Sequence, residues 1–141
     1  MTRPSAVVRI LVVDDFEPFR RFLHAILKTR PELHVIGEAS DGLEAVQKAQ
    51  DLKPDLILLD IGLPKLNGIE TADRLSRLLP DAKILFISQD NDPDLVATAL
   101  SSRAKGYLWK QTANTELLPA IETVLRQDEV VSVQVRLPFL I

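Results

Sequence analysis

The chain has 141 residues, which corresponds to one domain of ordinary size, and its 46% hydrophobic and 26% charged residues are typical of a soluble globular protein. It contains no cysteine, which excludes disulfides, zinc–thiolate sites and catalytic thiols. The formal net charge of -3 argues against a nucleic-acid-binding surface, and no apolar run is long enough to span a membrane. We therefore expect one cytoplasmic domain that itself binds neither nucleic acid nor membrane.

The first half of the chain predicts two strands, each followed by a helix. The strands are the apolar runs at residues 7–13 and 33–39. The first helix has helically spaced apolar residues that should form its buried face: Phe19, Phe22, Leu23 and Ile26. The second helix begins at a capping arrangement of Asp41 and Glu44 and should bury Leu43, Val46 and Ala49.

The second half repeats this alternation three times. Strands are predicted at residues 56–59, 84–87 and 106–109. The helix after the first of them follows the cap residue Asn67, and the next helix opens with Asp92 and Pro93. In the last helix, Pro119 should distort the first turn, because proline lacks the backbone donor.

Apolar strands that alternate with helices predict a parallel sheet covered on both faces. Right-handed crossovers leave few strand orders for such a domain. We expect an α/β fold of the flavodoxin-like, doubly wound type, with five parallel strands in the order 2-1-3-4-5 and five helices.

Three carboxylates follow the predicted strands at the point where ligands bind in such sheets. Asp14 and Asp15 follow the first strand and Asp60 follows the third, and these strands flank the switch point of the topology. Like charges this close oppose folding unless a cation lies among them, and Mg²⁺ favours one or two carboxylates with water and phosphate oxygens. The sequence therefore predicts a magnesium site at this edge of the sheet.

A hydroxyl and an ammonium group are expected at the same edge. Ser88 ends the fourth strand and Lys110 follows the fifth. A carboxylate nucleophile, a metal, a lysine and a hydroxyl donor together are typical of a phosphoryl-transfer site. An aspartate at a strand end is by itself more often a turn or cap residue, so the prediction rests on the whole set.

The same motifs resemble the receiver domain of two-component response regulators, most closely the NarL/LuxR type. They are Val12-Val13-Asp14-Asp15, the run from Leu58 to Gly68, Ser88, and Gly106-Tyr107-Leu108-Trp109-Lys110. The resemblance implies a receiver over residues 1–128, with a tail or linker remnant at residues 129–141 and no output domain.

The resemblance also implies roles for single residues. Asp60 would accept a phosphoryl group from a sensor histidine kinase, and Asp14, Asp15, Asp60 and the Gly62 carbonyl would hold Mg²⁺. Lys110 would pair with the phosphoryl group, and Ser88 and Tyr107 would be the switch pair that changes the face of helix 4, strand 5 and helix 5. That face would engage a second receiver or a transcriptional output partner. Tyr107 and Trp109 could also be plain packing residues; we favour a switch role for Tyr107 and packing for Trp109.

Arg103 and the tail are among the features that depart from the common receiver pattern. Arg103 stands where the loop after the fourth helix usually has glycine, so a left-handed conformation there would be strained or absent. In the tail, the apolar residues Val131, Val133, Val135 and Leu137 alternate with polar ones and predict a strand. We favour a frayed linker remnant; the alternative is pairing with an edge strand of a neighbouring chain.

Three functions are compatible with these motifs. The first is the phosphorylation switch, without turnover of an external substrate and with at most slow self-dephosphorylation. The second is an interaction module of receiver fold that is never phosphorylated, because fold does not determine function. The third is a metal-dependent phosphohydrolase, which is disfavoured because Gly62 stands where a general acid two residues after Asp60 would be needed.

Overall fold

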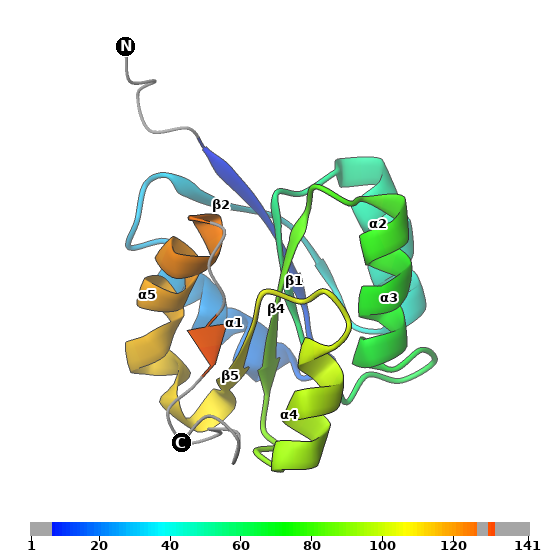
Figure 1. Ribbon diagram of the computed structural model, residues 1–141. Coiled ribbons are helices and arrows are strands. Elements are labelled where there is room, and N and C mark those ends of the chain that lie inside the picture. The colour runs from blue at the N-terminus through cyan, green and yellow to red at the C-terminus, as the bar shows by residue number, and fades with distance from the viewer. Residues whose placement is uncertain (1–6, 127–129, 132–141) are drawn as a thin grey trace.

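The computed structural model describes residues 7–126 and 130–131 (Figure 1). Its strands are β1 (Val8–Val13), β2 (Leu33–Ala39), β3 (Leu56–Leu59), β4 (Lys83–Ser88), β5 (Gly106–Trp109) and β6 (Val130–Val131). Its helices are α1 (Glu17–Leu27), α2 (Gly42–Leu52), α3 (Gly68–Leu78), α4 (Pro93–Leu100) and α5 (Ala113–Leu125), with a 3-10 turn over Lys110–Thr112 before α5. In the described part of the chain, no helix is both long and apolar enough to cross a bilayer.

The sheet has the predicted topology. Its strands are parallel and lie in the order β2-β1-β3-β4-β5-β6, so the predicted order 2-1-3-4-5 is confirmed for the five main strands. The chain leaves β1 toward β2 and returns on the other side to β3. The switch point therefore lies between β1 and β3, where Asp14 and Asp60 follow their strands.

Helices cover both faces of the sheet and create two separate cores. Helices α1 and α5 pack on one face, and α2, α3 and α4 pack on the other (Figure 1). Successive residues of β1 alternate between these cores: Leu11 and Val13 face α2 and α3, whereas Ile10 and Val12 face α1 and α5. Because helices cover both faces, the strands β1, β3, β4 and β5 are apolar at most positions, as the sequence indicated.

The helix starts follow the predicted caps. The Asp41 carboxylate accepts a hydrogen bond from the Glu44 amide at 2.8 Å, and the Glu44 side chain accepts one from the Ser40 amide at 2.7 Å. The Asn67 side chain caps α3 through the Glu70 amide at 2.9 Å. These bonds satisfy amides that have no partner inside the helix, so the local sequence determines where α2 and α3 begin.

Three details of the predicted helices are wrong. Phe22 and Leu43 are exposed, because the neighbouring elements cover only the faces of α1 and α2 centred on Leu23 and Ala45. Pro119 lies in the interior of α5, because the helix begins at Ala113, ahead of its apolar residues. Pro119 is exposed, and so is Thr115, whose carbonyl loses its hydrogen-bond partner.

Arg103 adopts the left-handed conformation that a glycine would favour. Its φ is 72°, so the turn between α4 and β5 forms despite the substituted Cβ. Left-handed backbone is costly for a residue with a side chain, and surrounding structure must stabilise it. The left-handed conformation is therefore present at Arg103, together with the strain that we expected there.

The first residues of the tail pair with their own sheet. Val130 and Val131 form β6, which is parallel to β5 with Val130 opposite Gly106 and Val131 opposite Tyr107. The sheet thus extends beyond the five predicted strands. The remaining predicted strand residues, Val133, Val135 and Leu137, lie outside the described residues, so both the favoured linker remnant and the alternative pairing with a neighbouring chain stay predictions.

Candidate functional site

The three predicted carboxylates meet at the carboxyl edge of the sheet. One carboxylate oxygen from each of Asp14, Asp15 and Asp60 lies within 4.8 Å of the others. Asp14 is 2% exposed and Asp60 is 7% exposed, whereas Asp15 is on the surface. The topology therefore brings together side chains that are 46 residues apart in the sequence, as expected from the strand ends.

Backbone hydrogen bonds place the two buried aspartates. The Asp14 amide donates to the Ala39 carbonyl and the Asp60 amide donates to the Val13 carbonyl, each at 3.0 Å, so both residues continue the strand ladders. The Asp14 carboxylate accepts from the Phe16 amide at 2.8 Å, and the Asp60 carboxylate accepts from the Gly62 amide at 3.3 Å. Both side chains are thus held in defined positions at the edge.

Lys110 supplies the only cationic group within ion-pair distance of these carboxylates among the described residues. Its Nζ lies 2.6 Å from Oδ2 of Asp14 and 3.5 Å from Oδ2 of Asp60. The ammonium also lies 4.4 Å from the centre of the Phe19 ring, and the side chain is 15% exposed. One positive charge thus faces three carboxylates, which leaves the cluster negative.

The pKa of Asp60 is raised above its usual value, which indicates that the site has too little positive charge for its carboxylates. Burial is the largest influence and raises its pKa; Lys110 lowers the pKa, and Asp14 raises it again. The ionised form of Asp60 is therefore costly in the folded protein. A divalent cation among the three carboxylates would remove this cost, and an all-oxygen ligand set suits Mg²⁺. The residues present therefore fit such an ion.

This raised pKa predicts how stability depends on pH. An acid whose pKa is higher in the folded state than its usual 3.8 stabilises the fold most when protonated, and that stability is lost as pH rises through the folded pKa. Without divalent cations, Asp60→Asn should have a larger free energy of unfolding than wild type near neutral pH. This difference between the two proteins should decrease as the pH is lowered. Urea unfolding at a series of pH values measures this difference, and a constant difference would contradict it.

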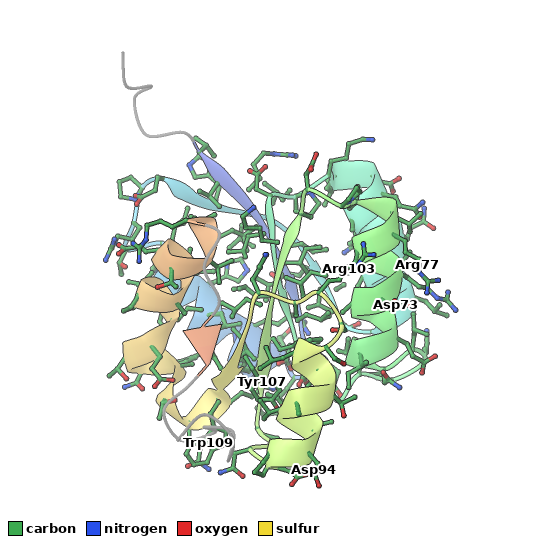
Figure 2. All side chains as sticks on the ribbon, viewed as in Figure 1. Asp73, Arg77, Asp94, Arg103, Tyr107 and Trp109 are labelled. Carbon is green, nitrogen blue, oxygen red and sulfur yellow. The ribbon has the colours of Figure 1, made fainter. Side chains whose placement is uncertain are left out.

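The predicted switch residues are in direct contact with one loop. Ser88 is 3% exposed, and its Oγ accepts a hydrogen bond from the Asp90 amide at 3.1 Å. The Tyr107 hydroxyl donates to the Asp90 carbonyl at 2.7 Å, and its ring is fully buried between β5 and α4 (Figure 2). Burial raises the pKa of Tyr107, while a hydrogen bond with Ser88 acts in the opposite direction. Tyr107 is therefore already in an inward position.

Trp109 packs as predicted and also touches the site's rim. It lies at the end of β5 (Figure 2), its ring is packed against the core beside α4, and its Nε1 donates to the Gln89 carbonyl at 3.1 Å. Gln89 and Lys110 both border the site. Trp109 is the only tryptophan, so its fluorescence is a single-site probe of this region.

A cleft of about 730 Å³ opens over the cluster. It is lined by five of the predicted residues: Asp15, Asp60, Gly62, Ser88 and Lys110. Phe16, which is 60% exposed, adds an apolar wall, so the cleft offers room for a small anionic group beside the acids and lysine. Gly62 borders the cleft, and the space beside its Cα is open, since a Cβ atom there would meet nothing within 4 Å. That its carbonyl is a metal ligand stays a prediction.

Sequence reasoning missed three contacts that shape the site. Arg20 donates to the Asp14 carbonyl at 2.6 Å, and Glu38 holds Arg20 at 2.6 Å. Gly68 lies so close to Asp60 that a Cβ atom there would be 2.2 Å from the Asp60 carbonyl oxygen. The close approach of Gly68 depends on tertiary packing, and Arg20 meets Glu38 across 18 residues, so neither has a local signal.

Comparison with known proteins identifies the family. The family model described as response regulator receiver domain matches residues 10–122, which is most of the chain and includes every predicted site residue. The chain belongs to the response regulator receiver domain family. Its motifs place it with the NarL/LuxR type, as the sequence indicated.

Relatives and solved structures agree with this assignment. The receiver domain is 37% identical over 118 residues to the transcriptional regulatory protein LnrK of Bacillus subtilis, covering 84% of this chain and 54% of that protein. It is 37% identical to the nitrate/nitrite response regulator NarL of Escherichia coli, with coverage of 87% and 57%. The chain thus spans about half the length of the curated relatives it matches.

Two solved structures show the same fold. A LuxR-family response regulator from Aurantimonas matches with a TM-score of 0.87 at 28% identity, covering 92% of this chain and 93% of that one. The receiver domain of a putative NarL from Mycobacterium tuberculosis matches with a TM-score of 0.80 at 33% identity, covering 86% and 98%. The chain is therefore the receiver domain of a two-component response regulator.

Proposed function

We propose that this receiver domain accepts a phosphoryl group on Asp60 from the phosphohistidine of a sensor histidine kinase, with Mg²⁺ as cofactor. The observation that carries the proposal is the position of Asp60, which shares its cleft with Asp15, Ser88 and Lys110. The receiver unit comprises residues 1–128 and acts in the cytoplasm, without contacting nucleic acid or membrane itself.

The transfer begins with an Asp60 oxygen in line with the phosphorus–nitrogen bond of the donor. The oxygen–phosphorus bond forms as the phosphorus–nitrogen bond breaks, and the electron pair stays on the imidazole nitrogen. Lys110, 3.5 Å from Oδ2 of Asp60, faces the negative charge that spreads over the phosphoryl oxygens. Mg²⁺ held by Asp14, Asp15, Asp60 and the Gly62 carbonyl would supply further positive charge at those oxygens.

The switch follows from the contacts of Ser88. Its hydroxyl lines the cleft and accepts from the Asp90 amide, and the Asp90 carbonyl accepts from Tyr107. When Ser88 turns toward the phosphoryl group, the loop at Asp90 and the Tyr107 ring must readjust together. The affected face comprises α4, β5 and α5, and it would engage a second receiver or a transcriptional output partner.

The proposal is tested by measuring the intact mass of the wild-type protein after incubation with acetyl phosphate, with and without Mg²⁺. We expect a gain of one phosphoryl group that requires Mg²⁺ and decays slowly through self-dephosphorylation. No adduct under either condition would favour an interaction module that is never phosphorylated. Rapid release of inorganic phosphate without an adduct would favour a phosphohydrolase.

A further inference from the structure

Asp14 is held by four contacts, and one of them is made by its main-chain carbonyl. Its amide is bonded within the sheet, and its carboxylate is held by Lys110 and the Phe16 amide. Its carbonyl accepts a hydrogen bond from Nη1 of Arg20 at 2.6 Å. The first amides of α1 bond to the Phe16 carbonyl instead, so this side chain takes the place of a backbone donor.

Arg20 is itself held from the neighbouring strand. Its Nε donates to Oε1 of Glu38 at 2.6 Å, and its side chain is only 15% exposed. Glu38 lies on β2 directly opposite Val12 of β1, and its other oxygen is 3.0 Å from Nε2 of His24. The guanidinium thus links α1, β1 and β2, a task for which its planar, multi-donor geometry is suited.

The position of the Asp15 carboxylate depends on the contact between Arg20 and the Asp14 carbonyl more than the positions of the other two carboxylates do. The Asp15 carboxylate is exposed and accepts no hydrogen bond within the described residues, whereas the Asp14 and Asp60 carboxylates are each held by one backbone amide and by Lys110. The Asp14 carbonyl belongs to the peptide group that joins Asp14 to Asp15. When that peptide plane is held, the direction in which Asp15 leaves the main chain is held too.

We propose that Arg20, clamped by Glu38, is a positioning residue that aims the Asp15 carboxylate at a divalent cation in the acidic cluster. This inference deepens the proposed function and rests on its Mg²⁺ site. Arg20 holds the peptide between two ligand residues and touches neither the cation nor the phosphoryl group. Residues that orient metal ligands in this way typically affect metal affinity by about 10- to 100-fold.

A positioning role of Arg20 and a purely electrostatic effect of its charge predict opposite changes in the Mg²⁺ affinity of Arg20→Met. Arg20 places a positive charge near an acidic site, so electrostatics alone predicts that Arg20→Met binds Mg²⁺ more tightly. Loss of positioning predicts weaker binding. Arg20→Lys separates the two effects further, because it keeps the charge but loses the fork that bonds Asp14 and Glu38 together.

The experiment titrates Mg²⁺ into the apo protein, followed by Trp109 fluorescence and by calorimetry. We expect the dissociation constant to rise about tenfold in Arg20→Met and several-fold in Arg20→Lys. Glu38→Gln should weaken binding in the wild-type background and change little when Arg20 is already Met, because both act through one contact. The matched control is Arg21→Met on the same helix, whose side chain is 72% exposed and should leave affinity unchanged.

Each outcome decides between the claims. Unchanged or tighter binding in both Arg20 variants, with wild type binding Mg²⁺ normally, overturns the positioning role and leaves the proposed function intact. Absence of Mg²⁺ binding by wild type itself overturns the proposed metal site and this inference with it. Should Arg20→Met fail to fold in thermal melts, Arg20→Lys and Glu38→Gln decide the question, since each retains part of the network.

Discussion

Replacing Asp60 with asparagine should abolish the phosphoryl adduct completely while making the apo protein more stable at neutral pH. Asparagine has the same shape but lacks the nucleophilic carboxylate, so acetyl phosphate with Mg²⁺ should add no mass. The substitution also removes a buried carboxylate whose pKa is raised by burial and by Asp14, and whose ionised form opposes folding. Intact mass and urea unfolding of the same sample measure both effects.

The matched control is Asp81→Asn, an exposed aspartate between α3 and β4 that lies outside the cleft. It should retain the full adduct and unfold with an unchanged free energy. An adduct that persists in Asp60→Asn would show that another residue accepts the phosphoryl group. Loss of the adduct together with a large loss of stability would contradict our account of the charge balance in the site.

Substituting Gly68 with alanine should destabilise the protein by about 2 to 3 kcal/mol, because overpacked sites have costs of this size. A Cβ atom at this position would lie 2.2 Å from the Asp60 carbonyl oxygen and 2.5 Å from the Ile61 Cα. Both are backbone atoms, so the segment carrying Asp60 must move. Urea unfolding should report the loss, and Mg²⁺ affinity should fall with it as the carboxylates separate.

Gly62→Ala is the natural comparison for Gly68→Ala. A Cβ at Gly62 would meet nothing within 4 Å, and none of the described glycines has a positive φ. The unfolding free energy of this variant should stay within about 0.5 kcal/mol of wild type. Equal losses in the two variants would mean that chain flexibility, rather than the close approach to Asp60, determines the effect.

Much of the fold follows from local patterns. Alternating apolar strands and helices predicted the doubly wound sheet, and the capping side chains of Asp41 and Asn67 marked where α2 and α3 begin. The errors concern burial and length. Phe22 and Leu43 fit a helical spacing but lie beyond the area that the sheet and its neighbours cover. The spacing predicts Pro119 in a first turn because the apolar residues of the helix begin at Leu117, whereas the helix itself already begins at Ala113.

The candidate site divides in the same way. The order of strands places Asp14, Asp15, Asp60, Ser88 and Lys110 at one edge, because parallel strands all end on the same side, and the sequence by itself determined that set. Only the tertiary structure decided how the set is supported. The contact of Arg20 with Glu38 and the approach of Gly68 to Asp60 join segments whose packing no local periodicity encodes. Secondary structure follows short-range preferences, whereas the charge balance and aim of the carboxylates depend on long-range contacts.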